Sequence, residues 1–166
     1  MRSLFKKVIV AVNGSEQSIH ASMYSILMAK QLGCELKAVY VVDTATIRQL
    51  TLSKFLISDE SNNYEKSLEE EGKKLLESVV QLSKQKGVKI QTELRKGAVW
   101  SELITCAEEY KADLIVLGGK EHDRVSVGSV LKKDHISATN FGIVGYAGCN
   151  VLIVREKDIE KRFKIE

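Results

Sequence analysis

Residues 112–119 read Ala-Asp-Leu-Ile-Val-Leu-Gly-Gly, an apolar run that ends in two glycines. The start of the chain shows the same pattern of an apolar run followed by a loop that contains glycine. There, residues 7–12 (Lys-Val-Ile-Val-Ala-Val) lead into Asn13, Gly14 and Ser15. Short runs that are apolar throughout are typical of parallel strands covered on both faces. Open α/β sheets bind ligands where such strands end in loops. The two runs therefore predict an α/β sheet with a ligand site between their loops.

Segments with strand and helix patterns alternate along the rest of the chain. Strands are expected at residues 8–12, 36–42, 88–94, 114–117 and 151–154, and helices at residues 16–32, 64–86 and 99–110. Ser15 and Gly33 are placed to begin and end the first helix. Repeated strand–helix–strand units imply parallel strands with right-handed crossovers. We therefore predict an α/β fold with a single doubly wound five-stranded parallel sheet, strand order 3-2-1-4-5, and helices on both faces.

Two segments fall outside this alternation. Residues 43–63 are mixed and polar, which indicates a mobile flap between the second strand and the next helix. Residues 155–166 are charged and compatible with a helix. The domain prediction is accordingly one domain over residues 1–155 and a charged C-terminal tail over residues 156–166.

The composition excludes several classes of protein. A net charge of +3 over 166 residues is too small to predict binding to nucleic acid or to an anionic membrane. No apolar run approaches the roughly 20 residues that span a bilayer, and the N-terminus lacks the apolar core of a signal peptide. The three cysteines are widely spaced, which favours free thiols in a reducing compartment. We therefore predict a cytoplasmic protein with no nucleic-acid or membrane partner.

With these segments in place, the chain resembles the universal stress protein family over nearly its whole length. Residues 8–16 are similar to the family's first strand followed by Asp-Gly-Ser-Glu, and residues 38–43 resemble its second strand. Residues 97–118 follow its most recognisable stretch. Residues 149–155 resemble its closing Cys-Pro-Val strand, with Asn150 in place of the proline. The resemblance implies the adenine nucleotide alpha hydrolase-like fold.

Some family members bind ATP through a signature of Gly, two residues, Gly, nine residues, and Gly-Ser or Gly-Thr, and others lack it. Here Gly118 matches the first glycine, but Glu121 stands at the second, where a carboxylate repels phosphate. Gly128-Ser129 arrives about three residues early, whereas an alignment from Cys149 places the terminal pair near residues 137–139. The ATP-binding signature is therefore degenerate.

The resemblance also implies which residues surround a nucleotide. Asn13 replaces an acid, so it keeps hydrogen-bonding capacity but loses the charge that helps to hold a metal-bound phosphate. ATP is the cofactor that the family pattern implies, with Mg²⁺ expected only if ATP binds. The cofactor-binding residues predicted in this way are Ala11, Val12, Asn13, Gly14, Ser15, Val41, Leu117, Gly118, Gly119, Lys120, Gly128 and Ser129.

The remaining reactive side chains form no catalytic or metal-binding pattern in the sequence. The histidines at positions 20, 122 and 135 are not spaced as metal ligands. Ser15 lacks the Gly-x-Ser-x-Gly context of a nucleophile, so a helix cap is preferred. The cysteines are expected in the core, and the glycines of residues 140–150 are expected to allow a helix to pack closely on the sheet. No catalytic residue and no metal ligand is predicted.

The resemblance implies a binding or regulatory module that binds ATP or another adenine nucleotide weakly or in an altered manner, and that is at most a weak ATPase. Family members commonly pair through the last strand, and the apolar edge at residues 151–154 would otherwise be exposed, so we predict a homodimer. Two alternatives stay open. One is a dimeric interaction protein that binds no nucleotide, and the other is a nucleotide-dependent enzyme of the same fold.

Overall fold

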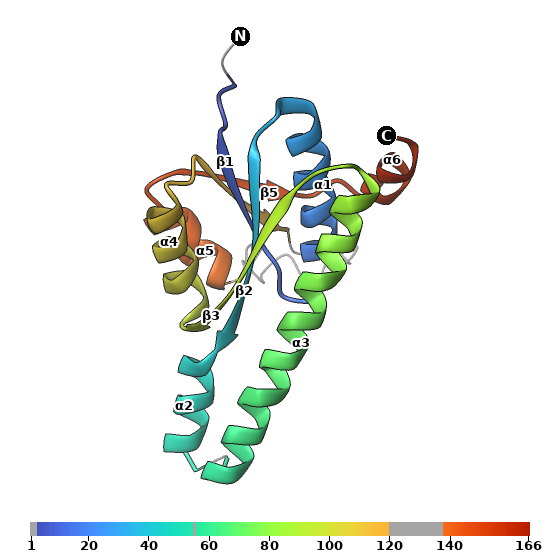
Figure 1. Ribbon diagram of the computed structural model, residues 1–166. Coiled ribbons are helices and arrows are strands. Elements are labelled where there is room, and N and C mark those ends of the chain that lie inside the picture. The colour runs from blue at the N-terminus through green and yellow to red at the C-terminus, as the bar shows by residue number, and fades with distance from the viewer. Residues whose placement is uncertain (1–2, 55, 120–137) are drawn as a thin grey trace, which may run out of the picture.

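The computed structural model describes residues 3–54, 56–119 and 138–166, which form one five-stranded sheet flanked by helices (Figure 1). The strands are β1 (Lys7–Ala11), β2 (Glu35–Asp43), β3 (Ile90–Gly97), β4 (Leu114–Gly118) and β5 (Asn150–Val154). The helices are α1 (Glu16–Leu32), α2 (Thr44–Leu52), α3 (Ser58–Gln85), α4 (Val99–Tyr110), α5 (Ala138–Tyr146) and α6 (Ile159–Ile165).

The sheet is parallel throughout, with the strand order β3-β2-β1-β4-β5, as predicted. The central strand β1 pairs on both sides, since Val10 lies opposite Ala38 of β2 and Val116 of β4. The winding therefore reverses between β1 and β4. This is the place where open α/β sheets present a ligand site at the carboxyl ends of their strands.

Each face of the sheet carries its own apolar core, because successive side chains of a strand point to opposite faces. Val8 and Val10 of β1 belong to a core with α1, α3 and α6, whereas Ile9 belongs to a core with α4 and α5. Figure 1 shows these two groups of helices on opposite sides of the strands. The apolar runs that predicted buried strands thus reflect coverage on both faces.

Helix α1 begins and ends where the sequence predicts. The Ser15 hydroxyl accepts a hydrogen bond from the Ser18 backbone N–H at 3.1 Å. At the other end, Gly33 adopts φ 67° and donates its backbone N–H to the Ala29 carbonyl at 2.9 Å. A left-handed residue at this position favours glycine. The Ser15 cap and the Gly33 stop are both confirmed.

Residues 43–63, which were predicted as an irregular flap, are mostly helical where the structure describes them. Helix α2 occupies the first half of that segment, and α3 begins at Ser58, six residues before the predicted start. Asp43 caps α2 by accepting from the Thr46 backbone N–H at 3.0 Å and from the Thr46 hydroxyl at 2.7 Å. Ile47 is the buried residue of α2, so this helix has no apolar stripe for a sequence pattern to detect. In Figure 1 α2 and the N-terminal part of α3 extend together beyond the sheet.

The charged C-terminal segment contains the short helix α6, which packs on α1. Ile159 and Phe163 are buried in the core that α6 shares with α1 and α3. The chain end is also held by α1, because the Lys30 ammonium donates to the Glu166 carbonyl at 2.7 Å. Residues 159–165 therefore belong to the folded structure despite their charge.

Candidate functional site

A cavity of about 260 Å³ lies at the carboxyl ends of β1, β2 and β4, on the side of the sheet covered by α4 and α5. Its volume is just below the roughly 300–1,000 Å³ of typical ligand pockets. The described residues that line it are Ala11, Val12, Asn13, Val39, Tyr40, Val41, Val99, Leu103, Leu117, Thr139, Asn140 and Ile143.

Five of the twelve predicted site residues are brought together in this lining, namely Ala11, Val12, Asn13, Val41 and Leu117. They lie on three strands or directly after one of them, and they meet because the carboxyl ends of those strands lie at one edge of the sheet. The lining side chains are mostly apolar, and none carries a formal charge at neutral pH. The polar groups come from the end of β1 and from the first turn of α5. Such a cavity suits a mainly apolar ligand that makes a few hydrogen bonds.

Asn13 stabilises the loop that leads from β1 into α1. Its side-chain carbonyl accepts from the Ser15 backbone N–H at 3.0 Å and from the Ser15 hydroxyl at 2.6 Å. An asparagine that bonds the backbone two residues on is a standard turn former. The carbonyl oxygen of Asn13 is therefore engaged within the loop. The amide group of the same side chain is the part that remains for a ligand.

Asn140 connects the first turn of α5 to the end of β4. Its side-chain amide donates to the Gly118 carbonyl at 2.9 Å, and both Asn140 and its neighbour Thr139 line the cavity. Asn140 was not predicted, whereas Thr139 belongs to the stretch that the sequence left open as an alternative end of the signature. A signal was present, because the alignment from Cys149 placed the end of the signature near residues 137–139.

Gly118 and Gly119 do not line the cavity, and packing accounts for both glycines. A Cβ atom on Gly118 would lie 2.5 Å from the Gln17 carbonyl carbon and 2.8 Å from the Ser18 nitrogen of α1. A Cβ atom on Gly119 would lie 2.9 Å from the Val154 carbonyl oxygen. Helix α1 can approach β4 this closely because its buried face consists mainly of small residues, Ser18, Ala21, Ser22, Ser25 and Ala29. Glycine is thus required at position 118 whether or not a phosphate binds there.

The other predicted site residues lie near the cavity or outside the described part of the chain. Gly14 has φ 82°, and its Cβ position is 3.1 Å from a methyl carbon of Leu75, so it shapes the loop between β1 and α1. Ser15 caps α1 in the same loop. Lys120, Gly128 and Ser129 fall outside the residues that the structure describes, as does Glu121.

The glycines of residues 140–150 allow contact between helices instead of contact with the sheet. A Cβ atom on Gly142 would lie 3.0 Å from the indole of Trp100, so α5 packs closely on α4. Trp100 also stacks on Tyr146, with 5.4 Å between the ring centroids. Gly145 and Gly148 have no heavy atom within 4 Å of a Cβ position. Of these three glycines, only Gly142 allows close packing, and its partner is helix α4 instead of the predicted sheet.

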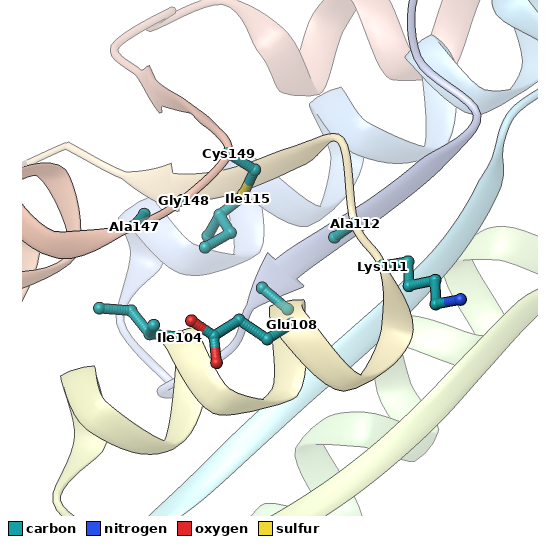
Figure 2. Close-up of a pocket in the computed structure, with 9 residues that line it drawn as sticks. Ile104, Glu108, Lys111, Ala112, Ile115, Ala147, Gly148 and Cys149 are labelled. Carbon is teal, nitrogen blue, oxygen red and sulfur yellow. The ribbon is translucent and has the colours of Figure 1, made fainter.

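A second and smaller cavity, of about 130 Å³, lies between α4 and the segment that precedes β5 (Figure 2). The thiol of Cys149 lies beside Ile115 and Ala147 in its lining, while Glu108 and Lys111 come from α4 and the residue after it. Burial, together with the Asp113 carboxylate, raises the pKa of Cys149. A thiol with a raised pKa is a poor nucleophile, so this arrangement does not indicate a catalytic cysteine.

The other two cysteines lie in the core, as predicted. Cys34 and Cys106 are both buried. Burial raises the pKa of Cys106 to about 11, and the nearby Glu93 carboxylate adds to the effect. Cys149 is half-buried. All three residues are free thiols.

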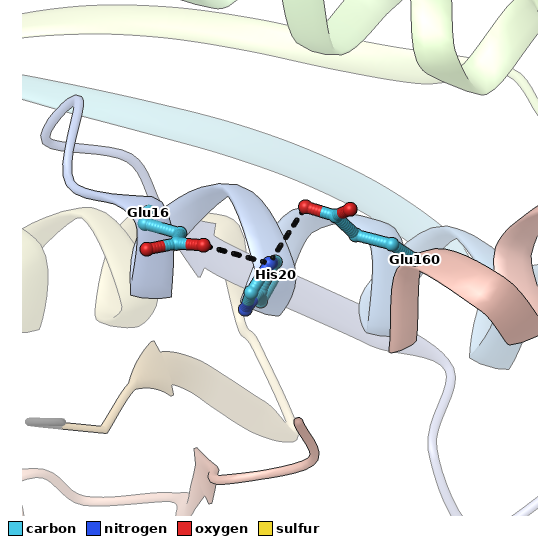
Figure 3. Close-up of side chains that lie close together, drawn as sticks. All are labelled: Glu16, His20 and Glu160. Atoms are coloured by element: carbon cyan, nitrogen blue, oxygen red, sulfur yellow. Dashed lines mark hydrogen bonds and ion pairs between the residues drawn. The ribbon is translucent and has the colours of Figure 1, made fainter. Parts of the chain in front are cut away.

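His20 is the one histidine in the described part of the chain, and it lies between two carboxylates (Figure 3). Its Nε2 atom is 3.1 Å from Oε1 of Glu160 and 3.9 Å from Oε1 of Glu16. Glu16 precedes it by four residues on α1, whereas Glu160 comes from α6. No sequence pattern predicts this grouping, because Glu160 is 140 residues from His20.

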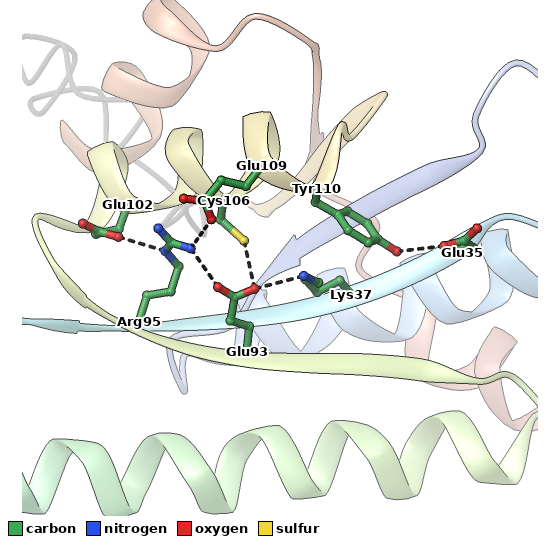
Figure 4. A network of polar contacts seen from close by, with 8 residues as sticks. All are labelled: Glu35, Lys37, Glu93, Arg95, Glu102, Cys106, Glu109 and Tyr110. Carbon is green, nitrogen blue, oxygen red and sulfur yellow. Dashed lines mark hydrogen bonds and ion pairs between the residues drawn. The ribbon is translucent and has the colours of Figure 1, made fainter.

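A network of charged side chains joins β2, β3 and α4 (Figure 4). Arg95 donates to Glu93 at 2.7 Å and to Glu102 and Glu109 at 2.8 Å each. Lys37 donates to Glu93 at 2.9 Å. Hydrogen bonds to three carboxylates raise the pKa of Arg95. The bond to Glu109 contributes most, followed by those to Glu102 and Glu93, and together they outweigh burial, which lowers the pKa.

The Glu93 carboxylate lies at the centre of this network. Burial raises its pKa, but the hydrogen bonds from Lys37 and Arg95 outweigh burial, so the pKa of Glu93 lies below its ordinary value. The network contains two cations and three carboxylates that already pair with one another. These ion pairs link the edge strand β3 to β2 and α4. Because the charges already pair with one another, the network does not resemble a site for a charged ligand.

Known proteins resemble the chain over most of its length. The model of the universal stress protein family matches residues 4–155. A universal stress protein of Methanocaldococcus jannaschii is 35% identical over 159 residues, which cover 93% of this chain and 84% of the relative. A universal stress protein of Bacillus subtilis is 27% identical and covers 92% of this chain and 100% of the relative.

Solved structures of universal stress proteins share this fold. One from Burkholderia pseudomallei has a TM-score of 0.70 at 22% identity, covering 93% of this chain and 98% of its own. An Archaeoglobus fulgidus protein in complex with dAMP has a TM-score of 0.63 at 13% identity, covering 92% and 99%. An Arabidopsis thaliana protein with AMP bound has a TM-score of 0.59 at 18% identity, covering 92% and 94%.

Among residues 3–54, 56–119 and 138–166, no helix combines the length and the apolar character needed to cross a membrane.

Proposed function

Because the chain belongs to the universal stress protein family, we propose that it is a binding or regulatory module whose cavity takes an adenine nucleotide. The observation that carries this proposal is the cavity at the carboxyl ends of β1, β2 and β4, which five of the predicted residues line. Its place matches the point where the winding of the sheet reverses. The AMP and dAMP found in two structural relatives support an adenine ligand.

The adenine ring is proposed to lie against the apolar strand ends, with Val41 and Leu117 among its contacts. The Asn13 amide would donate to the nucleoside, since its carbonyl is held by Ser15. The phosphates would extend towards the segment after β4, where the family pattern implies roles for Gly118, Gly119, Lys120, Gly128 and Ser129. In this arrangement the protein recognises the nucleoside mainly through shape and apolar contact.

Magnesium is proposed to matter little unless ATP is the ligand. Mg²⁺ in phosphate sites is held by carboxylates together with the phosphates, and the described lining of the cavity includes no carboxylate. The described lining also contains no carboxylate, histidine or lysine side chain that could act as a general base and activate water. We therefore propose a binding module with at most weak ATPase activity.

A substitution at Val41 tests the nucleotide proposal. Val41→Glu places a carboxylate in the cavity. This carboxylate would repel the phosphate, and a bound nucleotide would strip water from its charge at a cost in free energy. The affinity for AMP should therefore fall by about tenfold or more. Titration calorimetry with AMP, ADP and ATP, each with and without Mg²⁺, measures this. Gln91→Glu on the exposed side of β3 adds the same charge away from the cavity and should leave the affinity unchanged.

The outcome also separates the alternatives. If none of the three nucleotides produces heat or a thermal shift at millimolar concentration, the nucleotide proposal fails and an interaction protein is favoured. If Val41→Glu and Gln91→Glu have equal affinities, the nucleotide binds elsewhere than in this cavity.

We further propose a homodimer that forms through β5. This strand is an edge of the sheet, and Val151 and Ile153 on it are half-buried. The neighbouring α5 exposes Phe141 and Tyr146 by 69% and 71%. Among the described residues, an edge strand and exposed aromatic side chains are the kinds of surface that a second copy would cover.

Light scattering tests the dimer. The wild-type chain should have the mass of two copies at tens of micromolar, and Val151→Lys should shift the mass to one copy, because lysine on an edge strand opposes strand pairing. Val88→Lys at the opposite side of the sheet, just before β3, serves as the control. A wild-type mass of one copy would contradict the proposal.

We also propose a cytoplasmic location, because three free cysteines suit a reducing compartment. A role in the stress response is proposed on family membership alone. Fractionation of the source cells checks the location.

A further inference from the structure

The group of Glu16, His20 and Glu160 brings three donor atoms to one point on the surface, outside the nucleotide cavity (Figure 3). All three donor atoms lie within 4.8 Å of one another. They come from two helices that are distant in sequence, since His20 and Glu160 are 140 residues apart. The packing of α6 on α1, through Ile159 and Phe163, holds these helices together independently of the polar groups.

An ion pair between histidine and glutamate accounts for only part of this arrangement. A single ring nitrogen, Nε2, faces both carboxylates, at 3.1 Å from Glu160 and 3.9 Å from Glu16. One nitrogen carries at most one hydrogen, so it can donate fully to only one of the two carboxylates. With a neutral imidazole the group carries two negative charges, which a divalent cation would neutralise.

The distances match the requirements of a small transition-metal ion. Tetrahedral Zn²⁺ with ligands at about 2.0–2.1 Å separates its ligand atoms by about 3.4 Å. The two separations from Nε2 lie on either side of this value. One imidazole nitrogen with two carboxylate oxygens is a donor set that Zn²⁺ accepts, whereas Ca²⁺ and Mg²⁺ prefer oxygen alone. The side chains of Glu16 and Glu160 are mostly exposed, so water can complete the coordination.

We propose that Glu16, His20 and Glu160 form a Zn²⁺ site that joins the C-terminal helix α6 to α1. His20 provides the nitrogen ligand and is only 17% exposed, so its ring is already positioned by the two helices. Glu16 is the first residue of α1 and directly follows Ser15, so the bound ion lies next to the loop that leads from the nucleotide cavity. The ion would stabilise the docking of α6.

Calorimetry with ZnCl₂ on the metal-free full-length chain tests the site. The wild-type protein should bind one Zn²⁺ per chain and show a higher melting temperature with the metal. His20→Gln and Glu160→Gln should each weaken binding by at least about tenfold, the loss that even outer-shell changes can cause. The control variants are Glu70→Gln on the exposed face of α3 and the double variant His122→Gln, His135→Gln. Both should bind Zn²⁺ as the wild type does.

A spectrum with Co²⁺ identifies the ligand type. The proposal expects the d–d bands of cobalt bound by nitrogen and oxygen, with no charge-transfer band from sulfur. A thiolate band, an unchanged affinity in His20→Gln, or no binding by the wild type overturns the proposal. Loss of binding in the double histidine variant alone also overturns it, because the ion would then lie outside this group.

Discussion

Gly118 shows how a single residue that looks like a phosphate-binding glycine is required for packing. The position of its Cβ is occupied by the backbone of α1, whose Gln17 carbonyl carbon would be 2.5 Å away. Backbone atoms cannot rotate aside as the end of a long side chain can. A family resemblance alone therefore does not separate a glycine kept for a ligand from one kept for the contact between a helix and a strand.

We expect Gly118→Ala to lower the free energy of unfolding by about 1–3 kcal/mol, the usual cost of overpacking, or by more if α1 must move. Gly145→Ala is the matched control, because nothing lies within 4 Å of its Cβ position and it is an exposed residue within α5. There alanine should be neutral or stabilise by up to about 1 kcal/mol. Urea unfolding of both variants measures the difference. Equal stabilities would show that α1 yields to the extra methyl group at no cost.

Single residues were predictable where their role is local. Ser15 and Gly33 are adjacent to the helix ends that they cap, so the sequence pattern contains all that their roles require. Asn140 and Glu160 act on partners far away in the sequence, Gly118 and His20. Such contacts depend on the packing of whole helices, and no local pattern encodes them.

At the scale of elements, the edge strand β3 is held by charged side chains as well as by its pairing with β2. Glu93 and Arg95 point towards α4, where Arg95 meets Glu102 and Glu109 (Figure 4). The lowered pKa of Glu93 means that the folded state favours its ionised form. Its contribution to stability is fully present above the unfolded pKa of about 4.3 and is lost as the pH falls through the lower folded pKa.

Glu93→Gln should therefore make the free energy of unfolding less dependent on pH below about 4.3, the region where the wild-type carboxylate takes up its proton. Denaturant unfolding at a series of pH values between neutral and acid measures the slope. Glu108→Gln, an exposed change on α4, is the control and should reproduce the wild-type slope. If Glu93→Gln has the wild-type slope as well, the lost stability at acid pH arises from other carboxylates.

The accuracy of the predicted bounds differed between elements. The bounds of α1 and α4 agree with the predicted residues 16–32 and 99–110. Strand β3 was expected at residues 88–94 and lies at Ile90–Gly97, because polar residues continue the pairing with β2 as far as Gly97. Helix α2 was missed because it buries little of its surface, so its sequence has the composition of a loop.

For the whole molecule, the sheet order and the position of the cavity followed from topology. Parallel strands with right-handed crossovers leave few arrangements, and the reversal between β1 and β4 then locates the site. The extent of the folded unit was harder to predict. The family model ends at residue 155, whereas α6 lies beyond it and still contributes Ile159 and Phe163 to a core.

If α6 is part of the cooperative fold, a core substitution within it should destabilise the entire domain. Phe163 is 4% exposed and packs under the Lys86 ammonium, which lies 4.7 Å from the centre of its ring. Phe163→Ala should lower the free energy of unfolding by about 3–5 kcal/mol, the cost of a large-to-small change in a core. Ile165→Ala on the same helix is the control, because Ile165 is 84% exposed and should change stability by less than about 0.5 kcal/mol.

Calorimetric unfolding distinguishes the two ways in which α6 can be attached. A single transition that moves to lower temperature in Phe163→Ala means that α6 unfolds together with the sheet. A separate early transition, with the main transition at its wild-type temperature, would mean that α6 is an appendage whose loss the domain tolerates. The first outcome is expected, because Ile159 and Phe163 share their core with α1 and α3, and α1 in turn packs directly against β4 through Gly118.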